Sequence, residues 1–287
     1  MTRAGILSIV ATPIGNLGDF SARAAETLSK ADIIACEDTR VTKKLLRLTG
    51  TLLSGKIMAY HDHNGEKMRP YLLQRMAAGD HIALVSDAGT PLISDPGYKL
   101  VAACRSAGIA VTTTPGPSAV IAGLAVSGLP TDRFMFAGFI PGSTKARAKA
   151  FSEIADMSAT VIWFDAPSRL ARLLSDMADI LGQRQACIAR ELTKLHEETI
   201  NGDLRELANR IESMPPLKGE VVLVVAGRAG DVDAMDDTML AELLRAEMDG
   251  QRLRDAVTNV VSATGIAKNR VYRIALAVAN DSTGTED

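Results

Sequence analysis

The sequence predicts an α/β protein with two α/β domains followed by a short helical extension. Short runs rich in β-branched residues alternate with segments of helical periodicity up to about residue 230. The connections between them are short, and the composition changes after that point. A chain of 287 residues can hold more than one domain, and we predict domains at 1–115, 116–230 and 231–287.

Five strands are predicted in the first domain, separated by four helices. The strands are 6–12, 31–37, 56–61, 81–87 and 109–115. The helices are 21–30, 39–50, 65–79 and 98–108, where apolar residues follow helical spacing and most segments end near a glycine. Regular alternation of strand and helix predicts a mostly parallel sheet that is covered on both faces.

The second domain shows a further series of strands and helices. The strands are 134–140, 159–166, 185–193 and 220–227, with helices starting near residues 145, 168 and 203. Between the two series, the corner Pro115-Gly116-Pro117 is expected to open a helix with proline in its first turn.

Two short helices are expected in the extension, on either side of Gly265. The apolar positions that follow helical spacing are Leu253, Ala256, Val257, Val260, Val261, Val271, Ile274, Ala275 and Val278. Facing apolar stripes of this kind are typical of a helix-turn-helix pair. An acidic segment after Gly230 is expected to lead into this region.

Bulk properties narrow the class of protein. The net charge of −2 provides no overall attraction to nucleic acid, although local basic patches can still bind it. The three cysteines form no CxxC pair, which indicates a reducing, cytoplasmic environment. No apolar run approaches the ~20 residues of a membrane helix, so we expect no membrane association.

Four polar loops follow predicted parallel strands at their carboxyl ends, where α/β proteins bind ligands. They read ATPIGNLGD, CEDTR, SDAGTPLISDPG and TPGPSA. The third makes two tight turns where a connector needs one, which suggests a loop shaped to hold a ligand. Its second corner, Asp95-Pro96-Gly97, is expected to cap the next helix.

Several common functional motifs are absent from the sequence. No two glycines are separated by a single residue, so the chain contains no GxGxxG fingerprint and no Walker P-loop. A GxSxG elbow is also missing, which disfavours a serine hydrolase of the α/β type. His61 and His63 have metal-like spacing, but no compact carboxylate or cysteine set accompanies them. We therefore expect satisfied or solvent-facing histidines and no metal site.

Taken in order, the loop motifs resemble those of the tetrapyrrole methylase superfamily of S-adenosylmethionine-dependent methyltransferases. The matching stretches are VATPIGNLGDFSARA, ACEDTRVTKKLL, ALVSDAGTPLISDPGYKLV, TPGPSAVIAGLAVSGLPTDRFMFAGFIP, ARELTKLHEE and GEVVLVVAG. Within the superfamily, the chain is most similar to members that methylate the 2′-hydroxyl of a cytidine in small-subunit ribosomal RNA. The segment after Gly230 resembles the helix-turn-helix-like extension of some members.

The resemblance implies a cofactor, a partner and a cofactor site. The cofactor is S-adenosylmethionine in the cleft between the two α/β domains, the partner is the small ribosomal subunit or its precursor, and a homodimer is expected. The implied cofactor-binding residues are Pro13, Ser86, Asp87, Ala88, Gly89, Pro117, Ser118, Ala119, Phe164, Ala166, Pro167 and Gly219. The small residues among them would let backbone groups approach the cofactor closely.

The resemblance also implies an acceptor side formed by the first two loops. It places Asn16, Glu37, Asp38 and Arg40 there, and the catalytic candidates are Glu37, Asp38 and Arg40. The substrate-binding candidates are Asn16 and a set of basic residues chosen for their charge, namely Lys43 at a helix start, Arg190 and Lys194 at a strand end, and Lys268 and Arg270 in the extension. A ribose hydroxyl is a poor nucleophile, so a base or a positive neighbour would assist it. Glu37, Asp38 and a lysine with a depressed pKa all remain candidates for the base.

One stretch departs from the pattern of the superfamily, which commonly reads Tyr/Phe-Glu-x-Pro-His-Arg-Leu. This chain has Asp165 in place of the glutamate and Ser168 in place of the histidine. We expect both to be cofactor-pocket or helix-capping residues, with Ser168 capping the helix that begins there.

Two alternative functions stay open on the sequence alone. One is methylation of a tetrapyrrole carbon on the same scaffold, against which the EDTR and ELTK motifs and the basic residues of the extension argue. The other is a non-catalytic RNA-binding protein that uses the terminal helix pair.

Overall fold

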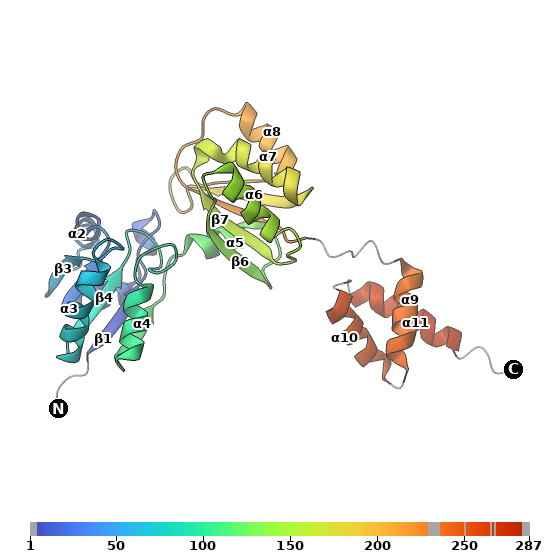
Figure 1. Ribbon diagram of the computed structural model, residues 1–287, viewed down its shortest axis with the longest axis horizontal. Helices are drawn as coiled ribbons and strands as arrows, with labels where there is room; N and C mark the ends of the chain where they lie inside the picture. The colour runs from blue at the N-terminus through green and yellow to red at the C-terminus, as the bar shows by residue number, and fades with distance from the viewer. Residues whose placement is uncertain (1–4, 229–235, 250, 265, 267, 283–287) are drawn as a thin grey trace. The chain divides into compact units, whose positions relative to one another are not determined.

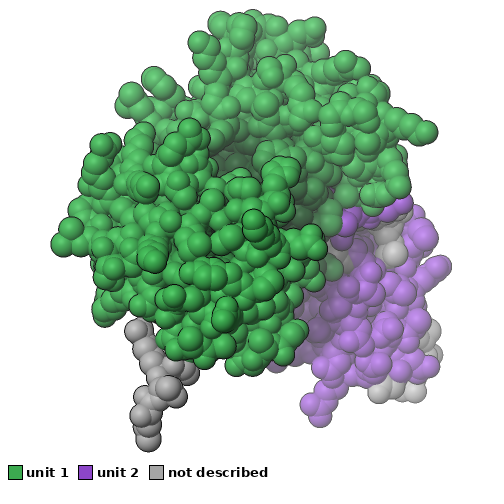
Figure 2. Space-filling model, turned by 60° about the vertical axis from the view of Figure 1, so that its left-hand side comes forward, with its two compact units in different colours: residues 1–155, 159–226 green, residues 156–158, 227–287 purple. Residues whose placement is uncertain are grey.

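The computed structural model describes residues 5–228, 236–249, 251–264, 266 and 268–282. The chain forms two compact units, coloured separately in Figure 2. The larger unit comprises residues 1–155 and 159–226 and contains both sheets, whereas the smaller comprises residues 156–158 and 227–287. The segments that build each unit are shown in Figure 1.

The first sheet is wholly parallel, as predicted. Its strands are β1 (Ile6–Val10), β2 (Ile33–Cys36), β3 (Lys56–Ala59), β4 (His81–Val85) and β5 (Ala110–Thr114). They lie in the order β3-β2-β4-β1-β5. The chain leaves β1 toward one edge of the sheet and β4 toward the other, so the point where the strand order reverses lies between β1 and β4.

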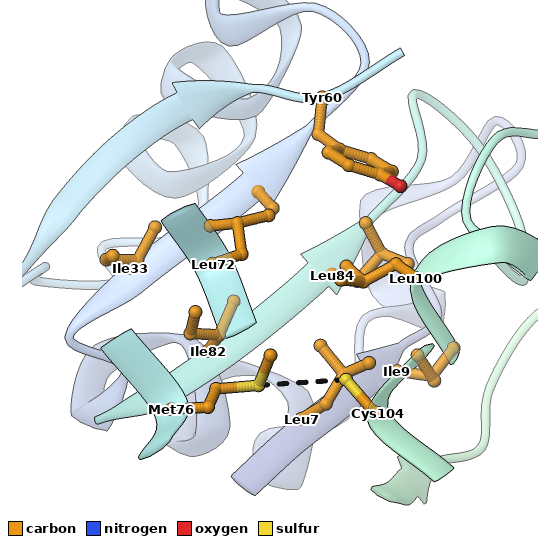
Figure 3. Close-up of a cluster of buried hydrophobic side chains, with 11 residues drawn as sticks. Leu7, Ile9, Ile33, Tyr60, Leu72, Met76, Ile82, Leu84, Leu100 and Cys104 are labelled. Atoms are coloured by element: carbon orange, nitrogen blue, oxygen red, sulfur yellow. Dashed lines mark hydrogen bonds between the residues drawn. The ribbon is translucent and has the colours of Figure 1, made fainter. Parts of the chain in front are cut away.

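Helices cover both faces of this sheet, because successive strand residues point to opposite sides. On one face, Leu7, Ile82 and Leu84 pack against side chains from α3 (Gly65–Ala77) and α4 (Tyr98–Ser106), as Figure 3 shows. On the other face, residues of the same strands pack against α1 (Ala22–Lys30) and α2 (Thr39–Leu48). The predicted two-sided cover is confirmed.

The second sheet is mixed, which the strand pattern did not predict. Its strands are β6 (Phe134–Phe139), β7 (Thr160–Asp165), β8 (Gln185–Arg190), β9 (Glu198–Asp203) and β10 (Val221–Val225). The order is β6-β7-β10-β8-β9, and only the β6–β7 pair is parallel. The edge strand β9 escaped prediction because its sequence, ETINGD, is polar and only Ile200 is deeply buried.

The helices of this half are α5 (Ala119–Ser127), α6 (Thr144–Glu153), α7 (Leu170–Leu181) and α8 (Leu204–Ser213). The expected proline in the first turn of α5 is wrong. Ser118 is the N-cap residue, and its hydroxyl accepts a hydrogen bond from the backbone N–H of Ile121 at 3.5 Å. Pro117 therefore lies before the cap, because a serine offers the free helix N–H groups an acceptor that a proline lacks.

The smaller unit contains three helices in its described part, α9 (Asp237–Met248), α10 (Leu253–Thr264) and α11 (Lys268–Ser282). The apolar stripes predicted for α10 and α11 form its core together with Leu240 and Leu244 of α9. The predicted turn residue Gly265 and the acidic segment at 231–235 lie outside the described residues. Among the described helices, none combines the length and the hydropathy that crossing a membrane would require.

Candidate active site

A pocket of about 330 Å³ lies in the larger unit, at the carboxyl ends of β1, β4 and β5 and beside the second sheet. Its lining residues from the first sheet's loops and α5 are Ile14, Asp87, Ala88, Gly89, Thr90, Ile93, Ser94, Asp95, Ser118, Ala119 and Val120. Those from the second half are Phe139, Phe164, Asp165, Ala189, Leu192, Glu220, Val221 and Val222. The loops meet where an α/β sheet of this topology binds its ligand.

Hydrogen bonds tie the three loops into one wall. Thr12 and Gly89 form a two-way backbone bridge, with N···O distances of 2.9 and 3.1 Å. The Thr12 hydroxyl also donates to the Ser86 carbonyl at 3.2 Å, and the Thr90 hydroxyl donates to the Pro117 carbonyl at 3.1 Å. Because these bonds join the loops after β1, β4 and β5, the pocket wall is held before any ligand binds.

The loop after β4 contains residues with unusual backbone conformations. Leu92 and Ser94 have φ values of 76° and 62°, in a backbone region that residues other than glycine seldom occupy. Strain of this kind collects at functional sites, where the surrounding structure holds it. The second corner provides the N-cap of α4 through Gly97, as expected, but without a side-chain hydrogen bond, while Asp95 lines the pocket.

The predicted cofactor residues divide into two groups in the structure. Asp87, Ala88, Gly89, Ser118, Ala119 and Phe164 line the pocket. Pro13, Ser86, Pro117, Ala166, Pro167 and Gly219 do not. Ser86 and Pro117 contact lining residues through hydrogen bonds: the Ser86 hydroxyl donates to the Ala88 carbonyl at 3.2 Å, and the Pro117 carbonyl accepts from the Thr90 hydroxyl.

Gly219 permits a charged network on the second-half side of the pocket. Its φ is +97°, and an added Cβ would collide with the Glu191 side chain. Glu191 can therefore accept from the backbone N–H of Glu220 at 3.0 Å. The Lys194 ammonium bridges the carboxylates of Glu191 and Glu220 at 2.9 and 3.0 Å.

Aromatic side chains of the second sheet also contribute to the pocket. The Phe164 ring lies 4.7 Å from the ring of Phe136 and 5.5 Å from that of Phe139, between centroids. Phe139 is 62% exposed although it lines the pocket. An exposed aromatic in this position offers a flat apolar surface to a ligand.

Asp165 lines the pocket as expected, whereas the predicted capping role of Ser168 is wrong. Asp165 is a buried carboxylate that binds the Arg169 guanidinium through two hydrogen bonds of 2.9 and 2.8 Å. Ser168 lies inside a single 3₁₀ turn, Pro167–Arg169, capped by Ala166. The α-helix α7 then starts at Leu170 with Arg169 as its N-cap residue and no side-chain cap hydrogen bond, so Ser168 does not cap this helix.

The loop after β2 lies next to the loop after β4. The backbone N–H of Asp38 donates to the Asp87 carboxylate at 3.1 Å. The Asp38 carboxylate caps α2 by accepting from the Arg40 N–H at 2.8 Å, and it also pairs with the Arg40 guanidinium at 2.6 Å. The Asp38 side chain therefore has a structural role, since it caps α2 and holds the Arg40 guanidinium.

The carboxyl groups of these loops differ in proton affinity. Hydrogen bonds from Arg40 lower the pKa of Asp38 to about 2. Burial, and then the negative charges of Asp87 and Asp62, raise the pKa of Glu37 above its usual value. A base with a raised pKa accepts a proton more readily, so Glu37 suits proton transfer better than Asp38.

The expectation of a lysine with a depressed pKa finds no support at Lys194. Burial alone would lower the pKa of Lys194, but hydrogen bonds from its ammonium to Glu191 and Glu220 outweigh it and raise that pKa. Lys194 is thus a cation held between two carboxylates. Its stem packs against Gly15 of the first loop, where an added Cβ would collide with it.

The other predicted substrate residues occupy several places. Asn16 caps a 3₁₀ turn, Leu17–Asp19, and is exposed, as is Lys43 on α2. Arg190 at the end of β8 pairs with Glu198 at 3.0 Å. In the smaller unit, Lys268 is exposed at the start of α11, and Arg270 pairs with Asp237 at 2.8 Å.

Sequence reasoning missed much of the pocket wall. The missed residues are Ile14, Thr90, Ile93, Ser94, Asp95, Val120, Phe139, Ala189, Leu192, Val221 and Val222. Most are apolar strand or loop residues whose side chains resemble ordinary core. The sequence of β10 does not alternate between apolar and polar residues, so nothing in it marks the residues that face the pocket; all five are apolar and buried.

His61 does not meet the expectation of a satisfied or solvent-facing ring. Its Nδ1 is buried and has no hydrogen-bond partner among the described residues, and its ring lies 5.9 Å from that of His63, between centroids. Within the described residues, no three His, Cys, Asp or Glu side chains converge as metal ligands would.

Comparison with known proteins agrees with this fold. The family described as Tetrapyrrole (Corrin/Porphyrin) Methylases matches residues 7–208. Diphthine synthase has a similar solved structure, with a TM-score of 0.58 at 16% identity over 78% of this chain and 90% of that one. Another is uroporphyrin-III C-methyltransferase from Thermus thermophilus, solved with S-adenosylhomocysteine, with a TM-score of 0.50 at 18% identity over 77% and 97%. The fold and the match define a methylase.

Curated relatives refine this class. A protein from Mesorhizobium japonicum named ribosomal RNA small subunit methyltransferase I is 44% identical, covering 98% of this chain and 94% of its own. One of the same name from Vibrio cholerae is 46% identical over 94% of both. The chain belongs to the tetrapyrrole methylase family and, within it, to the ribosomal RNA small subunit methyltransferase I group. It is a methyltransferase.

Proposed function

We propose that this enzyme transfers the methyl group of S-adenosylmethionine to the 2′-hydroxyl of a cytidine in small-subunit ribosomal RNA. S-adenosylmethionine is its methyl donor. The observation that carries the proposal is the pocket formed by the loops after β1, β4 and β5, in a chain whose relatives are named for the ribosomal RNA of the small subunit. A cytoplasmic homodimer that acts on the small subunit or its precursor belongs to the same proposal.

We assign the cofactor to this pocket. Ala88, Gly89 and Ala119 provide small walls and backbone groups, and the Phe164 and Phe139 rings provide apolar surface. Pro13, Ser86, Pro117, Ala166, Pro167 and Gly219 would support the wall rather than touch the cofactor. A pocket of about 330 Å³ falls within the range of small-molecule sites. The domain division at residues 115 and 230 is part of this proposal.

The chemistry mainly requires alignment of the hydroxyl oxygen, the methyl carbon and the sulfur, because the sulfonium is already a strong electrophile. Orientation of two reacting groups can supply up to ~7–11 kcal/mol of a barrier. Glu37 would take the hydroxyl proton, since the pKa of Glu37 is raised and its charge acts on both Asp87 and Asp95 at the pocket. Asp38 would set the position of Arg40.

RNA would be bound by basic side chains around the acceptor side. Arg40 and Lys43 are exposed on the same first turns of α2, where phosphate contacts are expected. Asn16, Arg190 and Lys194 are assigned to the same face. In the smaller unit, we assign Lys268 and Arg270 to RNA docking, with Arg270 exchanging its bond to Asp237 for a phosphate.

We expect Arg40→Ala to reduce methyl transfer about tenfold while cofactor affinity stays within about twofold, because the side chain is exposed and would contact RNA rather than the pocket. Cofactor affinity is measured by calorimetry and methyl transfer by incorporation of labelled methyl. Lys30→Ala, on the exposed surface of α1, is the matched control. A parallel fall in cofactor affinity and activity would contradict the assignment.

Deletion of the residues after Gly230 should leave cofactor binding intact and raise the substrate concentration needed for half-maximal rate. The described helices of the smaller unit have a hydrophobic core of their own, separate from the sheets. The defect should shrink as salt is lowered, because phosphate contacts strengthen at low ionic strength. A truncated protein with an unchanged substrate requirement at physiological salt would leave the extension without a role in RNA docking.

The substrate class is tested with labelled methyl donor and three acceptors, namely purified small subunits, naked ribosomal RNA and a precorrin-type porphyrinoid. The proposal expects transfer to one or both of the ribosomal acceptors and none to the porphyrinoid. Transfer to the porphyrinoid alone would support the tetrapyrrole methylation considered above.

A further inference from the structure

The charged residues that line the pocket are all acidic. Its acidic lining residues are Asp87, Asp95, Asp165 and Glu220, and its lining includes no Lys, Arg or His among the described residues. A low-dielectric wall with one sign of charge attracts a ligand part of the opposite sign.

Two of the four carboxylates are already neutralised by protein cations. Asp165 is paired with Arg169 at 2.8 Å, and Glu220 with Lys194 at 3.0 Å. Asp87 and Asp95, by contrast, form no ion pair in the part of the chain that the structure describes. Asp87 accepts one backbone hydrogen bond, from Asp38. Asp95 is thus a lining carboxylate that no cation of the protein offsets.

The surroundings of Asp95 make the ionised form of its carboxyl energetically unfavourable. Its carboxyl is about half buried in the loop after β4, beside Ser86. Burial, only partly opposed by the nearby Ser86 hydroxyl, raises the pKa of Asp95 to about 6, and the charges of Glu37 and Asp87 act in the same direction. Near pH 7.5 the group is therefore ionised, and a bound cation would relieve the cost.

We propose that Asp95, assisted by Asp87, makes this pocket select the positively charged methyl donor over its neutral product. The inference rests on the proposed function, in which the pocket holds S-adenosylmethionine. When the hydroxyl oxygen bonds to the methyl carbon, the carbon–sulfur bond breaks, its electron pair returns to sulfur, and the hydroxyl proton leaves. The sulfonium becomes a thioether, so the cofactor loses one positive charge.

This loss of charge would lower the affinity of the pocket for the product relative to the donor. The two forms of the cofactor differ little in shape beyond one methyl group, so apolar contacts discriminate weakly between them. A carboxylate a few ångströms from the sulfonium in a partly buried site favours the cation by about tenfold or more. The product would then leave more easily than the donor.

The test compares three ligands by calorimetry at pH 7.5. They are S-adenosylmethionine, S-adenosylhomocysteine and sinefungin, which carries an ammonium group in place of the methylsulfonium. In Asp95→Asn, we expect the dissociation constants of the two cationic ligands to rise about tenfold and that of S-adenosylhomocysteine to stay within about twofold. Asp132→Asn removes a charge from an exposed position outside the pocket lining and should leave all three unchanged.

A second measurement uses the unaltered protein, in case Asp95→Asn does not fold. The ratio of the two dissociation constants, product over donor, should fall as the pH is lowered through about 6, because Asp95 becomes protonated there. Glu37 and Asp87, whose pKa values are also raised by burial, titrate in the same direction and would deepen the fall.

Equal weakening of donor and product in Asp95→Asn, or no change in either, would overturn the inference, as would a ratio that does not vary with pH. Ala88→Leu separates this failure from that of the proposed site. If Ala88→Leu weakens both ligands while Asp95→Asn weakens neither, the pocket holds the cofactor but does not sort it by charge. If Ala88→Leu also leaves both unchanged, the cofactor binds elsewhere and the proposed site is wrong.

Discussion

Replacement of Ala88 by leucine is expected to weaken S-adenosylmethionine binding by about a hundredfold, equivalent to about 2.7 kcal/mol. Ala88 is exposed in the wall of the pocket, between Asp87 and Gly89. A leucine side chain there would project into the space assigned to the cofactor. The protein itself should stay folded, because the added atoms enter a cavity and not the packed core.

Calorimetry measures the affinity, and thermal unfolding without cofactor measures the fold. Ala102→Leu, the same change on the exposed surface of α4, is the matched control and should bind the cofactor normally. Near-normal affinity in a folded Ala88→Leu protein would contradict the site.

Glu37→Gln should lower the rate of methyl transfer by about a hundredfold, with cofactor affinity little changed, because general bases contribute about 10²–10⁴-fold. The amide keeps the size of the side chain but cannot accept the proton. In the unaltered enzyme, the rate should rise with pH as Glu37 loses its proton, at a pH above the ordinary range for glutamate, since burial raises the pKa of this group. That limb of the profile should vanish in Glu37→Gln.

Asp38→Asn is the informative comparison. Because hydrogen bonds from Arg40 lower the pKa of Asp38 to about 2, its carboxylate is a weak base, and the amide should reduce the rate less than Glu37→Gln does. An Asp38→Asn enzyme that loses more activity than Glu37→Gln would reverse the assignment of the base.

The fold of the first sheet could be predicted because each signal is local. The three inner strands β1, β2 and β4 are buried, largely apolar runs that end in polar loops, and the helices between the strands have buried apolar positions. Strand direction in the second sheet could not be predicted in this way. Antiparallel β10 and the four central residues of β8 are apolar and buried, as in a parallel strand, and the polar edge strand β9 has little hydrophobic signal at all.

The candidate site could be predicted where glycine, proline and serine residues indicate the turns of the backbone. Gly89, Ser118 and the small residues beside them lie in loops whose turns the sequence marks. Asp95 was not predictable as a pocket residue, because an Asp-Pro-Gly corner is also typical of a helix cap. It lies in the pocket lining just after two residues in left-handed conformations, Leu92 and Ser94. No local pattern announces such conformations in residues other than glycine.

Ion pairing also escapes prediction from the sequence. The motif ARELTK contains a lysine that could serve as a base, a phosphate contact or a salt-bridge partner. Only the folded protein shows that Lys194 contacts Glu220, 26 residues further along the chain, and that this contact helps to raise the pKa of Lys194, which argues against its use as a base. The same applies to Arg270, whose partner Asp237 lies 33 residues before it.

The most direct test of the central claim is the chemical identity of the methylated product. Small subunits that lack the modification are incubated with the enzyme and labelled S-adenosylmethionine, the ribosomal RNA is digested to nucleosides, and these are separated and weighed by mass spectrometry. The account predicts that the label appears in 2′-O-methylcytidine and that Ala88→Leu abolishes it. Label on a base, on another nucleoside or in no nucleoside would contradict the account.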